Sequence, residues 1–209
     1  MSCFDRITLT TAYFPPIEYF FAIANSNEVF IEQSEYYQKQ SYRNRCYIYA
    51  TDGKDFLNIP MSRDVTHKLP IREIKIDYTK PWLLQHKRAI VSAYQSSPFF
   101  EYYRDDLFPI LERKETYLFD LNCLLLEKLL CLVGLKTRIQ YTDTFIPISE
   151  NGDLREVIQP KYRGDNLLHQ YKKEKTYYQV FSNRYGFINN LSILDLLSNE
   201  GPNSISFLL

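Results

Sequence analysis

The segment RCYIYATDGKDFLNIPM, residues 45–61, holds two β-rich runs separated by a turn. The runs cover residues 46–50 and 56–59, where tyrosine, isoleucine and phenylalanine favour extended backbone. Asp52 and Gly53 lie between the runs, and this pair suits a tight turn because both residue types tolerate positive φ. The segment therefore predicts an antiparallel β-hairpin.

Toward the N-terminus the pattern predicts a strand, a helix and a second strand. Residues 7–11 are rich in β-branched side chains and alternate, which is typical of a strand. Pro15 and Pro16 suit the first turn of a helix, because apolar residues follow them at helical spacing as far as Ala24. Residues 29–32 predict the second strand.

Toward the C-terminus the pattern becomes mainly helical. Helices are predicted over residues 81–94, over 116–133 with Gly134 as the C-cap, and over 190–199. Residues 99–111 fit either another helix or an irregular aromatic segment. Short strands are predicted at residues 71–76, 138–141, 145–148 and 177–181, and a surface loop at 159–175.

These elements describe an α/β protein of the mixed α+β kind. The chain has 209 residues, of which 45% are hydrophobic, and this suits one domain with a substantial core. We therefore expect a single domain over residues 1–209. It should contain a mixed sheet, an early β-hairpin, a central helical section and a short C-terminal helix.

The charge balance excludes functions that depend on a strong overall electrostatic field. Lysine and arginine number 25, and so do aspartate and glutamate, so nucleic acid is not an expected partner. No long apolar run precedes Pro15, and no stretch approaches the roughly 20 apolar residues of a membrane-spanning helix. The four cysteines lack paired short spacing, which predicts reduced thiols. The expected location is the cytoplasm.

Motifs for familiar nucleotide and metal sites are missing from the sequence. The six glycines form no Gly-x-Gly-x-x-Gly, no phosphate-binding loop and no Gly-x-Ser-x-Gly elbow. The three histidines, His67, His86 and His169, are far apart, so no metal site is expected. The sequence leaves any cofactor unknown.

The densest polar cluster covers residues 36–45, just before the hairpin. Arg43 and Arg45 alternate, so a strand that begins early would place both guanidinium groups on one face, where they can grip a phosphate or carboxylate. Lys39 and Asn44 would complete this site. The alternatives are a solvated loop rich in tyrosine and a stacking groove for nucleic acid, and the balanced charge argues against the groove.

A second cluster lies on the helix predicted over residues 81–94. Trp82 and His86 are four residues apart and share a helix face, and Tyr94 follows at the helix end. Histidine titrates near neutral pH, which makes His86 the best candidate general base in the chain. A packed or capping histidine is an equal alternative.

One acid stands in an apolar setting in the predicted C-terminal helix. Leu194 and Leu196 flank Asp195. Such an acid is either a fixed hydrogen-bond partner or part of an exposed stripe, and we favour the fixed partner.

Several motifs resemble the WbqC-like protein family in their order and spacing. They are Tyr13-Phe14-Pro15-Pro16 with Tyr19-Phe20, Lys39-Gln40-Ser41-Tyr42-Arg43-Asn44-Arg45, Leu57-x-Ile59-Pro60, Trp82-x-x-x-His86, Ala89-Ile90 to Tyr94, Pro98-Phe99-Phe100 and Asn122. No single motif is specific, but together they span most of the chain. Residues 187–209 look like the form seen in Bacteroidetes members.

The resemblance implies a role in making surface polysaccharides, since the family name comes from O-antigen gene clusters, but it implies no general mechanism. The matching positions are Tyr13, Pro15, Lys39, Arg43, Asn44, Arg45, Trp82, His86, Tyr94 and Asn122. Family members often carry Gln-Pro before the Tyr-Phe-Pro element, whereas this chain has Thr11-Ala12 there. Any role of that glutamine is therefore lost or moved.

Two hypotheses for the function follow. The first is a transferase-like enzyme that acts on an activated, nucleotide-linked amino-sugar or related metabolite. In it, Arg43 and Arg45 hold the phosphates of this small molecule, and His86 deprotonates the attacking amine or hydroxyl. The substrate-binding candidates are Tyr13, Lys39, Arg43, Asn44, Arg45, Trp82, Tyr94 and Asn122. The second is a non-catalytic binding or scaffold protein of a cell-envelope pathway, which holds a partner on a tyrosine-rich surface.

Overall fold

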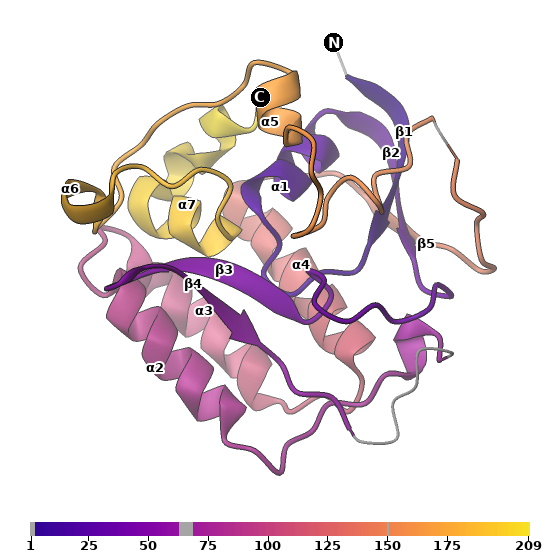
Figure 1. Ribbon diagram of the computed structural model, residues 1–209, viewed down its shortest axis with the longest axis horizontal. Coiled ribbons are helices and arrows are strands. Elements are labelled where there is room, and N and C mark those ends of the chain that lie inside the picture. Colours follow the sequence, from indigo (N-terminus) through magenta and orange to yellow (C-terminus); the bar gives the residue numbers. More distant parts are fainter. Residues whose placement is uncertain (1–2, 63–68, 150) are drawn as a thin grey trace.

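A small parallel sheet, a separate β-hairpin and a set of helices make up the fold (Figure 1). The computed structural model describes residues 3–62, 69–149 and 151–209. The strands are β1 (Phe4–Thr10), β2 (Ser26–Glu32), β3 (Arg45–Ala50), β4 (Gly53–Asn58) and β5 (Ile139–Tyr141). The helices are α1 (Ile17–Ala24), α2 (Trp82–Tyr94), α3 (Phe100–Glu112), α4 (Leu118–Val133), α5 (Leu167–Gln170), α6 (Ser182–Tyr185), α7 (Ile193–Glu200) and the 3₁₀ helices η1 (Ile71–Glu73) and η2 (Gly201–Phe207). The predicted mixed α/β class is confirmed.

The sheet has the order β1-β2-β5, and both strand pairs are parallel. The helix α1 connects β1 to β2, and the pairing places Ile7 opposite Val29 and Leu9 opposite Ile31. All four of these side chains are buried, which fixes the register because a slip of one residue would turn them toward solvent. The carboxyl ends of the three strands therefore meet at one edge of the sheet.

The predicted hairpin is confirmed, but its turn differs from the prediction. Ala50 pairs with Gly53, so the two-residue loop is Thr51 and Asp52. Gly53 has φ of 105°, whereas Asp52 does not have a positive φ. The glycine thus begins β4 directly after the turn, where the backbone conformation favours a residue without Cβ.

Three predicted strands are wrong. Residues 71–76 contain η1, followed only by isolated bridges at Lys75 and Ile76. Ile71 and Ile74, the residue after η1, are both buried, because residues three apart in a 3₁₀ turn lie on one side. Residues 145–148 and 177–181 form no strand. In the second segment the side chain of Gln179 takes the place of a partner strand. Its Nε2 donates to the carbonyl of Ile188, and its Oε1 accepts from the N–H of Ile188, both at 2.9 Å.

The helices are closer to the prediction. Residues 99–111 resolve into a helix, α3, and the predicted surface loop contains α5, whose Leu167 and Leu168 are buried. The central helix α4 ends at Gly134, which has φ of 85° as the prediction of a C-cap requires. Within the described residues, none of the helices has the length and apolar character needed to cross a bilayer.

One hydrophobic core joins both ends of the described chain. It contains β1 through Ile7, the centre of α4 through Leu125 and η2 through the neighbouring Leu208. The hairpin packs against α2 through β3, and Cys46 and Ile48 of β3 are buried in the same core as the apolar residues of α2 and α3. The span of a single domain over residues 1–209 stays a prediction.

Candidate functional site

A cavity of about 390 Å³ opens beside the hairpin, and three predicted site residues line it. They are Lys39, Asn44 and Arg45, and they are joined by Tyr37 from the loop after β2 and by Asn58 from the end of β4. The rest of the lining is Gln40, Ile59, Pro60, Met61 and Ser62. This volume lies in the range of small-molecule sites.

The cavity is lined by two cations and by no carboxylate among the described residues. Neither Lys39 nor Arg45 forms an ion pair with a described residue. The guanidinium of Arg45 stacks 4.3 Å from the ring centroid of Phe56, which holds it in place without neutralising it. Two uncompensated positive charges favour an anionic occupant.

Asn44 is fixed in the cavity wall by both its backbone and its side chain. Its Nδ2 donates to Oδ1 of Asn58 at 3.1 Å and to the carbonyl of Ile59 at 2.8 Å. Its own carbonyl accepts from the N–H of Ile59 at 2.8 Å. Because Nδ2 faces two oxygens, the orientation of the amide is determined, and Oδ1 is left buried without a partner.

Arg43 does not share a face with Arg45, contrary to the prediction. Its guanidinium donates two hydrogen bonds to the carboxylate of Glu35, from Nε to Oε1 at 2.9 Å and from Nη2 to Oε2 at 2.6 Å. Both side chains are buried. The reason is that β3 begins only at Arg45, so Arg43 lies before the strand and turns inward. Its carbonyl accepts a hydrogen bond from Asn122 at 2.8 Å.

His86 lies behind the cavity wall. Its Nδ1 is 3.0 Å from the hydroxyl of Tyr13, its ring also bonds the backbone of Asn58, and its side chain is 5% exposed. Burial lowers the pKa of His86 to about 4, against the smaller raising effect of the Asn58 bond, so the ring is neutral at pH 7. The edge of the Trp82 ring packs against it with centroids 5.0 Å apart.

Tyr94 lies away from the cavity, against the middle of β3. Its buried hydroxyl accepts from the N–H of Tyr49 at 3.3 Å. It neighbours Asp195, which accepts from the hydroxyl of Tyr177 at 2.6 Å and from Nε2 of Gln179 at 2.8 Å. The prediction that Asp195 is a fixed hydrogen-bond partner is confirmed.

Buried polar atoms without partners concentrate on the predicted residues. In the described part of the chain, four of seven such atoms are Oδ1 of Asn44, Nε of Arg45, Nε1 of Trp82 and Oδ1 of Asn122. Native interiors leave few polar atoms unpaired, and the exceptions are often filled by water or ligand. The hairpin region is therefore where an additional bound molecule is most expected.

The profile of the WbqC-like protein family matches residues 11–161. The chain belongs to this family. The matched span contains every predicted site residue, from Tyr13 to Asn122. The family is named after a polysaccharide-biosynthesis locus. Residues 187–209 lie outside the match, so their likeness to Bacteroidetes members stays a prediction.

A curated relative of this WbqC-like chain carries no assigned activity. The chain is 34% identical over 128 residues to the uncharacterized protein Rv1507c of Mycobacterium tuberculosis. The alignment covers 61% of this chain and 55% of that protein, so the chain spans about half the length of the relative. No solved structure matches the chain significantly.

Three residues with a clear structural role at or beside the cavity were not predicted. Glu35 neutralises Arg43, Tyr37 lines the cavity and Asn58 joins the cavity to His86. The sequence offers one signal, which is that Glu35 is an acid close to a cluster of cations. The roles of Tyr37 and Asn58 depend on how the loop after β2 folds over the hairpin, and no local pattern announces that.

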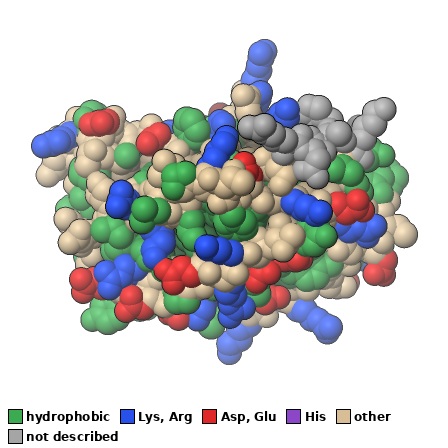
Figure 2. All heavy atoms as spheres, turned by 90° about the horizontal axis from the view of Figure 1, so that it is seen from below, with side chains coloured by type: hydrophobic (Ala, Val, Ile, Leu, Met, Phe, Trp, Pro, Cys, Tyr) green, Lys and Arg blue, Asp and Glu red, His purple; other side chains and the backbone are tan. Residues whose placement is uncertain are grey.

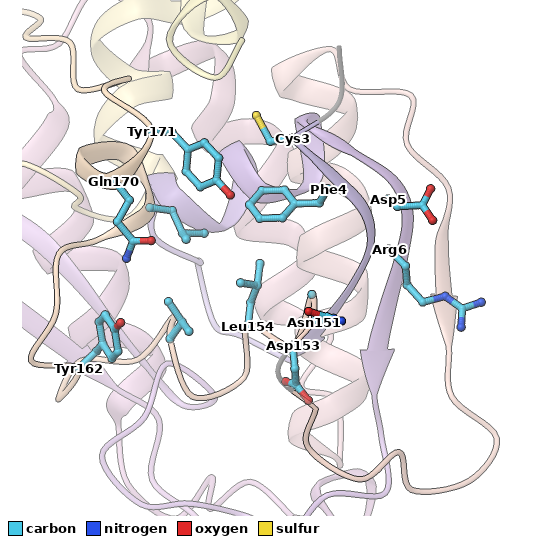
Figure 3. A pocket seen from close by; sticks show the side chains of 13 residues that line it. Cys3, Phe4, Asp5, Arg6, Asn151, Asp153, Leu154, Tyr162, Gln170 and Tyr171 are labelled. Atoms are coloured by element: carbon cyan, nitrogen blue, oxygen red, sulfur yellow. The ribbon is translucent and has the colours of Figure 1, made fainter.

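Another cavity, of about 530 Å³, lies elsewhere and contains none of the predicted residues. Phe4 and Tyr171 meet in it with ring centroids 5.3 Å apart, and Figure 3 shows the side chains of Asp5 and Arg6 pointing away from this pair. Arg6 is paired with Glu28 at 2.9 Å. Its cation is thus neutralised, unlike those of the cavity beside the hairpin.

Neither the face seen in Figure 2 nor the described side chains point to a nucleic-acid surface or a metal centre. Figure 2 shows a face on which acidic, basic and hydrophobic side chains alternate. Among residues 3–62, 69–149 and 151–209, no group of three or more histidine, cysteine, aspartate or glutamate side chains is arranged to hold a metal ion. His67 lies outside the described residues.

Proposed function

We propose that this WbqC-like chain is a transferase-like enzyme of surface-polysaccharide biosynthesis that acts on a nucleotide-linked amino-sugar or related metabolite. The observation that carries the proposal is the cavity beside the hairpin, where Lys39 and Arg45 are unpaired and no described carboxylate contributes to the lining. Guanidinium and ammonium groups are the side chains that bind phosphate best. The phosphates of the substrate therefore belong in this cavity.

The proposal divides the predicted residues by what they touch. Lys39 and Arg45 hold the phosphates, and Asn44 fixes the wall beside them. Arg43 and Asn122 are positioning residues. The guanidinium of Arg43 is bonded to Glu35, and the backbone carbonyl of Arg43 accepts a hydrogen bond from Asn122. Trp82 packs His86 in place, and Tyr94 supports β3.

In the transfer step, an amine or hydroxyl of the acceptor forms a bond to the transferred group as the bond from that group to the donor breaks. The donor fragment leaves with the electron pair, and the proton of the attacking group goes to His86. The pKa of about 4 keeps His86 in the neutral form that accepts protons, although as a weak base. The contact with Asn58 has to open before the ring reaches the cavity.

The second candidate function is a non-catalytic binding protein of a cell-envelope pathway. One observation favours it, which is that Nδ1 of the buried His86 is engaged by Tyr13 and that His86 does not line the cavity. A binding protein needs the cations of the cavity but no available base.

A thermal-shift and turnover assay with UDP, UDP-N-acetylglucosamine and acetyl-coenzyme A tests both functions. The variants are Arg45→Met, His86→Ala and, as a control, Arg88→Met, whose exposed side chain on α2 lines none of the cavities. The enzyme proposal expects turnover that His86→Ala abolishes while ligand affinity persists. Binding without turnover in the wild type favours the second candidate, and unchanged binding in Arg45→Met refutes both.

A further inference from the structure

A second cavity, of about 480 Å³, adjoins the first. The two share Tyr37 and Lys39 in their linings. The other lining residues of the second cavity are Glu35, Tyr36, Gln38, Phe145, Ile148, Arg155 and Glu156. Any ligand in this cavity therefore lies next to the proposed phosphate site.

The second cavity lies at the carboxyl edge of the parallel sheet. Glu35 follows the end of β2, and Phe145 follows the end of β5, which pairs with β2 (Figure 1). In open α/β sheets, ligands bind in the crevice outside the carboxyl ends of the strands. The position of this cavity is thus the one where such a fold favours a ligand.

A buried carboxylate holds together the two loops that form the cavity. Glu32, at the end of β2, is fully buried and accepts hydrogen bonds from the N–H of Ser34 at 2.7 Å, from Oγ1 of Thr142 at 2.9 Å and from the N–H of Ile146 at 2.7 Å. These donors belong to the loop after β2 and to the loop after β5. The cavity walls are therefore tied to the sheet rather than loosely apposed.

The lining combines apolar faces with hydrogen-bonding groups and has no net charge. Two acids, Glu35 and Glu156, and two cations, Lys39 and Arg155, line it; Glu35 is paired with Arg43 and Arg155 with Asp153. The apolar faces are unusually open, with exposed fractions of 62% for Tyr36, 51% for Phe145 and 61% for Ile148. The guanidinium of Arg155 lies 5.6 Å from the ring centroid of Phe145 and is anchored by Asp153 at 2.9 Å.

We infer that this second cavity binds a sugar ring, an inference that rests on the proposed function of the first cavity. A sugar ring presents C–H groups that pack on aromatic faces and hydroxyls that bond carboxylates, amides and cations, which is the combination that the lining offers. The ring belongs either to a free sugar or to the sugar end of a nucleotide-linked molecule whose phosphates occupy the first cavity.

Saturation-transfer NMR with N-acetylglucosamine, UDP and UDP-N-acetylglucosamine tests the inference. The variants are Tyr36→Ala and Phe145→Ala, and the control is Tyr102→Ala, which removes a 75% exposed tyrosine that lines neither cavity. Loss of an aromatic platform should weaken binding of the sugar about tenfold and leave UDP binding unchanged. Tyr102→Ala should change neither.

If N-acetylglucosamine binds on its own, the ligand of the second cavity is a free sugar. Sugar protons that receive saturation only in UDP-N-acetylglucosamine identify the nucleotide-linked molecule. Wild-type protein that transfers no saturation to sugar protons, or sugar binding that survives both Tyr36→Ala and Phe145→Ala, would overturn the inference. The Arg45→Met variant distinguishes failure of the phosphate site from failure of the sugar site. Unchanged UDP binding in this variant refutes phosphate binding in the first cavity, while sugar binding still reports on the second cavity.

Discussion

The hydroxyl of Tyr13 lies 3.0 Å from Nδ1 of His86, and both side chains are buried. This contact joins the loop after β1 to the helix α2. His86 in turn bonds the backbone of Asn58, which lines the proposed phosphate cavity. The pair therefore connects the first motif of the sequence to the cavity wall through two interactions.

Tyr13→Phe is expected to lower the free energy of unfolding by about 1–3 kcal/mol, because it leaves a buried ring nitrogen without its hydrogen-bond partner. Urea denaturation at pH 7 measures the change. Tyr19→Phe is a matched comparison, since the buried Tyr19 hydroxyl donates to the carbonyl of Thr10 at 2.7 Å. A Tyr13→Phe protein as stable as the wild type would show that the contact with His86 contributes nothing.

His86 should make the fold less stable in mild acid. Its pKa is about 4 in the folded chain and about 6.5 when unfolded, so between these values the unfolded chain binds the extra proton. Stability from this group is complete above pH 6.5 and falls by up to about 3 kcal/mol as the pH drops toward 4. Denaturation curves of His86→Gln should lack this part of the pH dependence, and an identical pH profile in that variant would contradict the assignment.

Asp195 should have the opposite effect over a similar pH range. Burial raises its pKa to about 6, so between about 3.8 and 6 the folded chain binds the proton and the unfolded chain does not. The ionised form above pH 6 costs up to about 3 kcal/mol, and this cost disappears in acid. Asp195→Asn keeps an acceptor for Tyr177 and should gain more stability over the wild type at pH 8 than at pH 4.5, as thermal denaturation at both pH values would show.

The two neighbouring arginines should respond differently to the same substitution. Arg43→Met leaves the buried carboxylate of Glu35 unpaired and is expected to cost about 3–5 kcal/mol of stability. Arg45→Met removes only a stacking contact with Phe56 and should cost less than about 1 kcal/mol. Equal losses, measured by chemical denaturation, would contradict the division between a structural and a ligand-binding arginine.

The sequence predicts those parts of the fold that depend on local pattern. The hairpin, α1, α2, α4 and α7 are recognisable because turn residues, prolines and apolar spacing lie within the elements themselves. Residues 71–76, 145–148 and 177–181 have strand-like composition but form no strand, since Lys75 and Ile76 make only isolated bridges to Tyr117 and Met61, and pairing is a property of the whole fold. A strand pattern without a partner becomes a turn or an extended loop.

The candidate site divides in the same way. The sequence identifies Lys39, Asn44 and Arg45 as a polar cluster, and the structure brings these residues to one cavity. The sequence does not reveal that Glu35 binds the guanidinium of Arg43 or that Asn58 separates His86 from the cavity. Both facts depend on side chains that meet only after the loop and the hairpin have folded together.

The most direct test of the phosphate cavity is the affinity for inorganic pyrophosphate, measured by isothermal titration calorimetry on the wild type, Arg45→Met and Arg88→Met. The account predicts that the wild type and Arg88→Met bind with the same affinity, and that Arg45→Met binds about tenfold more weakly. Equal affinity in Arg45→Met and the wild type, or a wild type that does not bind pyrophosphate, would contradict it.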